Sequence, residues 1–524
     1  MVTGTWRSRY PVYKRRRSPC WEACPAGNEI PKWIQLSKDN LYQAWEALVV
    51  NNPFPAVTGR VCHHPCEKAC NRLNYDEPLA INALEQYIGD QGLLYGWPLP
   101  APQKDLPEHV AVVGGGPAGL SCAYQLRQKG YRVTVFESRQ QLGGVLRSGI
   151  PGYRLPKKAL DQEIQRLLAL KIEVQLGKTL GKDLSLQELS GQYAAVFLAT
   201  GAQQAKKLSF EQVNGVWDGM DFLAKVNLSV PLSIGSRVVV AGGGSSAMDV
   251  ARVARRLGAD VKVIVMEARA EMPAIAAEIE QALAEGIKIY NNTVISALES
   301  KDGKLTAVRC LGYPGGGGEF RLETSALLVA IGQDIEVKGL EDLLASGQPG
   351  VPVDDHLSTV QPGVFAGGDL ITLQRSVVGA IGSGKKAAQS IQDYLGTKQA
   401  GKWQGLWETR AHQEKSVEFP EINTFYFLHE PRAVRGLRTP GERITDFQEV
   451  LTGLTGQAAG QEAGRCFSCG SCLQCDNCYN FCPDLAVGRF QAGEYQILDR
   501  YCKGCGVCAE ECPCGVVVLE EERR

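Results

Sequence analysis

The end of the chain carries one cysteine spacing twice. Residues 466–524 hold eleven of the eighteen cysteines, and two runs there have the form Cys-x2-Cys-x2-Cys-x3-Cys-Pro. In this pattern three closely spaced thiolates bind one cubane cluster, and the fourth cysteine of each run binds the other cluster. We therefore expect two [4Fe-4S] clusters, one held by Cys472, Cys475, Cys478 and Cys512 and the other by Cys502, Cys505, Cys508 and Cys482.

A pair of structural zinc sites is the alternative for these cysteines. Such sites use two Cys-x2-Cys pairs with a longer spacer, and they would leave the prolines and the third cysteine of each run unexplained. The two runs instead resemble a bacterial two-cluster ferredoxin, so an α+β domain of that type is predicted. Cys514 is surplus to both clusters and is predicted to be structural.

The composition is that of an ordinary globular protein. The chain has 524 residues, enough for several domains, with 44% hydrophobic and 22% charged residues and a formal net charge of -1. This balance gives no general attraction to nucleic acid, and no apolar run approaches the ~20 residues of a membrane helix. We expect a cytoplasmic protein whose cysteines bind metal. The basic run 14–17 is predicted to be a solvated terminal arm, or alternatively a guide for an acidic partner.

Two segments in the middle of the chain carry the signature of a dinucleotide-binding fold. The first begins with an apolar strand from Val110, continues through Gly114-x-Gly116-x-x-Gly119 into a helix, and ends with a second strand that closes at Glu137. The glycines allow a tight turn and the close approach of a pyrophosphate to the helix N-terminus, and the acid accepts a ribose hydroxyl. Residues 237–265 repeat this order.

Two further motifs indicate which ligand belongs to each segment. Residues 197–201 (Phe-Leu-Ala-Thr-Gly) and 364–369 (Val-Phe-Ala-Gly-Gly-Asp) resemble motifs of flavoprotein reductases with two dinucleotide sites. That resemblance implies FAD at the first segment and a nicotinamide cofactor at the second. A 2'-phosphate is best met by an arginine after the second strand, and a free 2'-hydroxyl by a carboxylate. Glu267 stands there, two residues before Arg269, so NADH is expected to be preferred over NADPH; a solvated helix start is the alternative for Glu267.

The first third of the chain makes the resemblance specific. Residues 1–105 are helix-rich and carry Cys-x3-Cys-Pro at residues 20–25 and Cys-x3-Cys-x3-Cys at 62–70. Residues 59–70, the segment Gly-Ile-Pro-Gly-Tyr-Arg-Leu-Pro at 149–156 and the paired nucleotide motifs are similar to the glutamate synthase small subunit. Dihydropyrimidine dehydrogenase shares this electron-input half. The resemblance covers residues 20–395 and implies two more [4Fe-4S] clusters in the helical part.

The same resemblance implies the residues that hold the two dinucleotides. For FAD they are Gly114, Gly116, Pro117, Ala118, Gly119, Glu137, Gly144, Val145, Leu146, Arg154, Leu180, Gly368, Asp369, Ser376, Val377, Val378, Ala380 and Ile381. For NADH or NADPH they are Gly242, Gly244, Ser245, Ser246, Ala247, Glu267, Arg269, Ala330, Ile331 and Gly332.

One cluster of the helical part lacks two of its usual ligands. The family has a further Cys-x2-Cys before the position of Cys20, where this chain has Lys-Arg-Arg-Arg-Ser-Pro, and the missing motif Glu-Ala-x-Arg-Cys-x2-Cys-Gly occurs instead at 462–470. We hypothesise that Cys466 and Cys469 fold back and complete a cluster with Cys20 and Cys70. The alternative is two idle thiols and an absent cluster. By the resemblance, the remaining cluster has the ligands Cys24, Cys62, Cys66 and Glu85, the last being an unusual non-cysteine ligand.

The expected architecture is multidomain α/β. It comprises an N-terminal α-helical iron-sulfur domain, two nested Rossmann-like domains and a C-terminal α+β ferredoxin domain. The predicted ranges are 1–105 for the helical [4Fe-4S] domain, 106–225 with 335–400 for FAD, 226–334 for NAD(P), 401–465 for a connector and 466–524 for the ferredoxin domain.

The expected function is NAD(P)H-dependent electron transfer. Cofactors carry hydride transfer, so no catalytic side chain is predicted; electrons pass between a nicotinamide cofactor and a protein partner through FAD and four clusters. A 2-oxoacid oxidoreductase, a sulfur-metabolism enzyme and a ferredoxin are the candidate partners, in a hetero-oligomeric complex. The alternatives are a relay without its own nicotinamide reaction, the glutamate synthase small subunit proper, and a self-contained small-molecule reductase. Disulfide reduction is disfavoured because no Cys-x4-Cys follows the first glycine motif.

Overall fold

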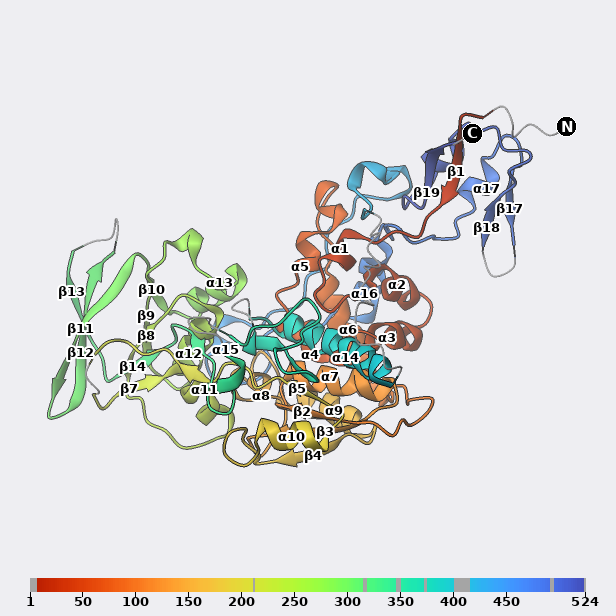
Figure 1. Ribbon diagram of the computed structural model, residues 1–524. Coiled ribbons are helices and arrows are strands. Elements are labelled where there is room, and N and C mark those ends of the chain that lie inside the picture. Colours follow the sequence, from red (N-terminus) through yellow and green to blue (C-terminus); the bar gives the residue numbers. More distant parts are fainter. Residues whose placement is uncertain are drawn as a thin grey trace. The chain divides into compact units, whose positions relative to one another are not determined.

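The computed structural model divides the chain into two compact units (Figure 1). It describes residues 7–210, 213–313, 318–344, 350–371, 375–399, 415–490 and 494–522. Unit 1 comprises Met1–Trp97, Trp403–Arg435 and Gly453–Arg524, and unit 2 comprises Pro98–Lys402 and Gly436–Thr452. The first fourteen residues of the predicted connector lie outside the described residues. No helix in the described part of the chain is long and apolar enough to cross a membrane.

The first half of unit 2 is built on a five-stranded parallel sheet. Its strand order is β16-β5-β2-β3-β4, and β3 ends at Glu137 as the sequence predicts. Short apolar strands with no alternation suit a parallel sheet that is covered on both faces; β2 and β5 are almost wholly buried. The long helix α14 packs along α7. The elements are β2 (His109–Val113), α7 (Pro117–Gln128), β3 (Arg132–Glu137), α8 (Val145–Ser148), α9 (Lys157–Leu168), β4 (Glu173–Leu176), α10 (Leu186–Gln192), β5 (Ala195–Leu198), β16 (Val364–Ala366) and α14 (Val377–Gln399).

The second half of unit 2 repeats this plan. A second parallel sheet has the order β10-β9-β8-β14-β7, and a three-stranded antiparallel sheet, β11-β12-β13, accompanies it. The two short strands β6 (Gln204–Ala205) and β15 (Gln333–Asp334) pair with each other. The other elements are β7 (Val216–Asp218), α11 (Gly219–Asn227), β8 (Arg237–Ala241), α12 (Ser245–Arg256), β9 (Asp260–Ile264), α13 (Ala276–Ala284), β10 (Lys288–Tyr290), β11 (Thr293–Lys301), β12 (Lys304–Gly312), β13 (Phe320–Glu323), β14 (Ala326–Val329) and α15 (Pro440–Arg443).

Unit 1 contains a small helical bundle held by two glycine contacts. A Cβ on Gly59 would lie 2.3 Å from the Gln86 backbone nitrogen, and one on Gly89 would lie 2.3 Å from that of Ala56. Only glycine permits such an approach, so the backbones of α4 and α6 touch. The helices are α1 (Pro19–Glu22), α2 (Ile30–Ser37), α3 (Leu41–Val49), α4 (Pro55–Val61), α5 (Pro65–Lys68), α6 (Ile81–Tyr95) and α16 (Gly456–Gly464).

The start and the end of the chain pair with each other in unit 1. Strand β1 (Arg9–Tyr13) runs antiparallel to β19 (Val517–Glu521), and the two lie side by side in Figure 1. The remaining elements of this part are α17 (Asn477–Asn480), the paired strands β17 (Val487–Arg489) and β18 (Tyr495–Ile497), and α18 (Val507–Glu510).

The expectation of a solvated arm at residues 14–17 is therefore wrong. The Lys14 backbone nitrogen donates to Val516 O at 2.9 Å and that of Arg16 to Gly470 O at 3.2 Å. The Arg16 guanidinium is buried and binds the Glu421 carboxylate. Long-range backbone pairing overrides the polar composition of this stretch, whereas Arg15 remains exposed.

A buried charge network lies in the second half of unit 2. The Glu285 carboxylate accepts hydrogen bonds from Arg252 and Arg256, at distances from 2.7 to 3.1 Å. Both guanidinium groups also lie over the ring of Tyr153, at 4.6 and 3.9 Å from its centroid. Removing the carboxylate from such a group leaves buried charges without their partner.

We expect Glu285→Gln to lower the free energy of unfolding of unit 2 by about 3–5 kcal/mol. The cost arises because two buried guanidinium groups lose their anionic partner. Thermal unfolding followed by near-UV circular dichroism measures it. Glu323→Gln is the control, since the Glu323–Arg237 pair is exposed; equal destabilisation by both substitutions would contradict the stabilising role of the buried network.

Candidate functional site

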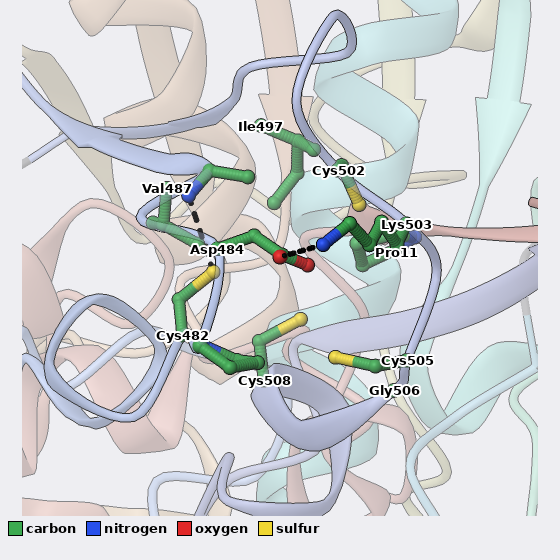
Figure 2. A pocket seen from close by; sticks show the side chains of 12 residues that line it. Pro11, Cys482, Asp484, Val487, Ile497, Cys502, Lys503, Cys505, Gly506 and Cys508 are labelled. Carbon is green, nitrogen blue, oxygen red and sulfur yellow. Dashed lines mark hydrogen bonds and ion pairs between the residues drawn. The ribbon is translucent and has the colours of Figure 1, made fainter. Parts of the chain in front are cut away.

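Two hollows in the C-terminal part of unit 1 are lined by cysteines. Each gathers the four cysteines that the spacing assigns to one cluster. The hollow in Figure 2 is lined by Cys482, Cys502, Cys505 and Cys508, and the other by Cys472, Cys475, Cys478 and Cys512. Sequence reasoning missed Pro11, which lines the first hollow, and Tyr13, which lines the second. Nothing in the sequence near residue 10 indicates that it pairs with residues 517–521.

The cysteine loops share a left-handed turn that points backbone N–H groups at sulfur. Two residues after the first cysteine of each run, Gln474 and Gly504 have φ of 55° and 71°. The Gln474 nitrogen donates to Cys472 Sγ at 3.4 Å. After the fourth cysteine of each run, Ala486 donates to Cys482 Sγ at 3.2 Å and Val516 to Cys512 Sγ at 3.4 Å. Such donors stabilise the negative charge of a metal-bound thiolate.

The same turn recurs at the two cysteines that precede the run. Ser468 has φ of 51° and its nitrogen donates to Cys466 Sγ at 3.4 Å, while Gly470 has φ of 73°. Cys466 and Cys469 thus stand on a loop with the local conformation of the other cysteine loops. This similarity distinguishes them from Cys122 and Cys310, which are fully buried as expected for small apolar side chains.

The structure brings Cys466 and Cys469 back to the N-terminal cysteines. Burial raises the pKa of Cys20, and the neighbouring Cys70, Cys469 and Cys466 raise it further. Asn71, the next residue after Cys70, donates from its side chain to Cys469 Sγ at 3.4 Å. The Arg72 guanidinium holds the carbonyl of Arg465 at 2.6 Å. The four cysteines of the fold-back hypothesis therefore lie together.

A second N-terminal group surrounds Glu85. Burial raises the pKa of Cys62, and Glu85 and Cys24 are the nearby charges that add to it. The pKa of Cys66 is raised by burial and by Cys62 and Cys24. The Glu85 Oε1 atom accepts from Thr58 at 2.9 Å and from Asn52 at 2.8 Å, and burial raises the pKa of Glu85 to about 7.

The donor set of these groups fits iron-sulfur clusters. In the described part of the chain, no three His, Cys, Asp or Glu side chains enclose a position for one metal ion. A cubane spreads its ligands differently, because each of four cysteines binds a separate corner. Three of the four groups are all-cysteine sets and the fourth adds one carboxylate, which is the ligand chemistry of the sequence-based prediction.

The first glycine turn has the close contacts of a dinucleotide site. Gly114 has φ of 114°, and a Cβ there would lie 2.3 Å from Ala199 O. A Cβ on Gly119 would lie 1.9 Å from Gly114 O. The Glu137 carboxylate accepts from the Gly115 backbone nitrogen at 2.8 Å, next to the N-terminus of α7. This is the geometry in which an anion meets helix N–H groups and a carboxylate meets a ribose.

The other residues predicted to hold FAD are spread more widely. A Cβ on Gly144 would lie 2.9 Å from the Cα of Gly116, so the 143–146 loop meets the glycine turn. Gly368 lies against Ala118, which places Asp369 near the start of α7. Burial raises the pKa of the Asp369 carboxyl group. Val378, Ala380 and Ile381 are buried on α14, and Leu180 packs in the core of the first sheet.

Arg154, which is also predicted to hold FAD, binds Asp249 at 2.6 Å and Glu278 at 2.5 Å in the second half of unit 2.

The second glycine turn reproduces the first. Gly242 has φ of 134°, and a Cβ there would lie 2.3 Å from Ala330 O. A Cβ on Gly114 has the same relation to Ala199 O. A Cβ on Gly243 would lie 3.0 Å from Glu267 Oε2, so Glu267 takes the place over the turn that Glu137 has in the first half. Arg269 is partly exposed and pairs with Glu280 at 2.7 Å. Ala330, Ile331 and Gly332 follow β14 at the same edge of the sheet.

Comparison with protein families shows to which family the chain belongs. Residues 108–389 match the family described as pyridine nucleotide-disulphide oxidoreductase. The chain belongs to this family. Residues 13–97 match the domain described as dihydropyrimidine dehydrogenase domain II, 4Fe-4S cluster. The chain is therefore an iron-sulfur flavoprotein of the kind that its motifs resemble.

Similar curated proteins are oxidoreductase subunits. The flavoprotein is 37% identical to the NADP(+)-dependent formate dehydrogenase subunit beta of Moorella thermoacetica, over 86% of this chain and 70% of that one. It is 32% identical to the NADPH-Fe(3+) oxidoreductase subunit beta of Geobacter sulfurreducens, over 86% and 75%. It is 33% identical to the NAD-dependent dihydropyrimidine dehydrogenase subunit PreT homolog of Salmonella typhi, over 72% and 91%.

We expect Gly119→Ala to empty the first dinucleotide site of this flavoprotein. The new methyl group would meet the Gly114 carbonyl and push the turn away from α7. The ratio of flavin absorbance to protein in the purified chain measures the loss. Gly396→Ala on α14 is the matched control, because its Cβ meets nothing within 4 Å. Full flavin content in the Gly119 variant would contradict the assignment.

Proposed function

We propose that the flavoprotein is an NAD(P)H-dependent electron-transfer subunit that passes electrons to a protein partner. The observation that carries this proposal is the presence, in one chain, of two dinucleotide turns and of cysteine sets for four clusters. FAD, when bound, converts a two-electron hydride into single electrons. The chain's own residues bind and orient the two dinucleotides. The glycine turns would contact the pyrophosphates, and Glu137 and Glu267 would accept hydrogen bonds from the ribose hydroxyls. No side chain has to act as an acid or a base.

Glu267 supports a preference for NADH. Its carboxylate lies over the second glycine turn, where it would accept a hydrogen bond from a free 2'-hydroxyl and would repel a 2'-phosphate. Arg269, two residues further along the chain, pairs with Glu280 at the protein surface. Two of the similar proteins carry NADP(+) or NADPH in their names and one carries NAD, so the coenzyme differs among similar chains.

The cluster count is proposed to be four. Two ferredoxin-type clusters would occupy the two hollows, and two would occupy the N-terminal groups, one completed by Cys466 and Cys469. The proximity of these two cysteines to Cys20 and Cys70 supports the fold-back. The ferredoxin module, residues 466–524 with β1, would then be the exit for electrons.

The surface of the ferredoxin module supports a protein acceptor. Cys472, Cys475 and Cys505 are exposed, which brings two clusters within reach of a partner. Large apolar side chains are exposed on the same module, as at protein interfaces: Tyr479, Phe481, Leu485, Phe490 and Tyr501. A 2-oxoacid oxidoreductase, a sulfur-metabolism enzyme and a ferredoxin stay the proposed partner classes, in a hetero-oligomeric complex.

NADH is expected to bleach the flavin faster than NADPH does under anaerobic conditions. Glu267→Gln should reverse or abolish this preference, because the carboxylate no longer repels a 2'-phosphate. Stopped-flow absorbance of the flavin band measures both rates, and Glu271→Gln, on the adjoining turn, is the control. Bleaching by neither coenzyme would contradict the proposed function, and faster bleaching by NADPH in the unaltered chain would contradict the role of Glu267.

Replacement of both Cys466 and Cys469 by serine is expected to remove one cluster. Iron and acid-labile sulfide should each fall by about four per chain, the content of one cubane, while the flavin content stays unchanged, since the two serines cannot replace the thiolates. Chemical analysis of the purified protein measures both. The control is Cys310→Ala, which removes a buried thiol of unit 2 that belongs to none of the cluster groups. An unchanged iron count in the double variant would refute the fold-back.

A further inference from the structure

The strand β1 is an integral part of the ferredoxin module. It pairs with β19 along its whole length, and two glycines of the cysteine loops have no room for a side chain because of this segment. A Cβ on Gly504 would lie 2.0 Å from Arg9 O, and one on Gly470 would lie 2.3 Å from Arg16 O. The N-terminal segment therefore packs directly against the loops that carry Cys502 and Cys469.

One face of β1 looks toward both cysteine hollows. Residues two apart on a strand share a face, and Pro11 lines the hollow of Cys482, Cys502, Cys505 and Cys508 while Tyr13 lines the hollow of Cys472, Cys475, Cys478 and Cys512. Pro11 offers no hydrogen-bond donor to the first hollow. Tyr13 brings a phenolic hydroxyl to the second.

The hydroxyl of Tyr13 is buried beside the Cys478 thiol. It makes no hydrogen bond of regular geometry to the described residues, and Cys478 is the side chain with which it interacts. The neighbouring ring of Tyr495 stacks on that of Tyr13, with centroids 6.1 Å apart, but the Tyr495 hydroxyl already donates to Asp476 at 2.8 Å. A neutral thiol is a weak hydrogen-bond acceptor, so the buried hydroxyl is poorly satisfied, which is costly. An iron-sulfur cluster would supply stronger sulfur acceptors at this place.

We propose that Tyr13 donates a hydrogen bond to a sulfur of the cluster held by Cys472, Cys475, Cys478 and Cys512, and thereby raises the reduction potential of that cluster alone. This inference rests on the ferredoxin-type clusters of the proposed function. A hydrogen-bond donor to a cluster sulfur stabilises the reduced form, because that form carries one more negative charge than the oxidised form. The described residues that line the other hollow include no hydroxyl. Their charged side chains, Lys503 and Asp484, bind each other at 2.7 Å (Figure 2).

The two clusters of the module are thus made unequal by a residue from the opposite end of the chain. In a two-cluster relay, the cluster with the higher potential holds the electron longer. Tyr13 would therefore bias the electron toward the Cys472 side, where Cys472 and Cys475 are exposed. The Cys514 thiol, 3.9 Å from Cys512 Sγ, lies at the same cluster.

The test is an anaerobic redox titration of the full-length chain, followed by electron paramagnetic resonance. Tyr13→Phe keeps the ring and its stacking but removes the hydroxyl. We expect the midpoint potential of one cluster signal to fall by up to about 59 mV. This corresponds to a tenfold change in its one-electron equilibrium constant. Tyr495→Phe, which removes the partnered hydroxyl, should leave that potential unchanged.

Three outcomes would overturn the role of Tyr13. They are an unchanged potential with all iron retained in Tyr13→Phe, an equal shift in Tyr495→Phe, and a loss of iron in Tyr13→Phe, which would show that the hydroxyl serves assembly. Failure of the proposed function looks different. In that case the unaltered chain would itself lack the iron and the signals of the two ferredoxin-type clusters.

Discussion

The burial of many thiols in a small volume is the constraint on which unit 1 depends. Burial raises the pKa of Cys20, Cys66 and Cys466, so without metal these side chains stay protonated and pack as small apolar groups. Iron binding has to displace those protons. The left-handed turns direct backbone N–H groups at sulfur atoms, and the glycine contacts bring the backbones of α4 and α6 together.

Unit 2 contains the same type of dinucleotide-binding turn twice, once in each half. In each half a glycine at positive φ lets the turn approach the carbonyl after a central strand, and a carboxylate lies over the turn. The halves are joined by side chains as well as by the backbone. Arg154, from the first half, binds Asp249 on α12 and Glu278 on α13, so a change in the orientation of the halves would have to break two buried ion pairs.

Local sequence patterns predicted the parts of the site that depend on spacing alone. The two cysteine runs, both glycine turns and the end of β3 at Glu137 follow from rules that act over a few residues, and the described structure has each of them. The family relationship is confirmed by the match over residues 108–389. The same rules failed at residues 14–17, because nothing in the neighbouring sequence indicates a pairing with Val516 and Gly470. Arg154 lies in a motif that indicates the flavin half, and its role there stays a prediction. Its pairing with two acids that lie far along the sequence was not predicted.

The pairing of β1 with β19 also orders events in time. A ribosome makes residues 9–13 long before residues 517–521, so the first strand of the ferredoxin module has to wait for its partner while the intervening chain is made. During that interval β1 is an unpaired strand edge, open to pairing with other chains. The charges around it, Arg9 and the run that follows Tyr13, are of the kind that keep such an edge in solution until its partner arrives.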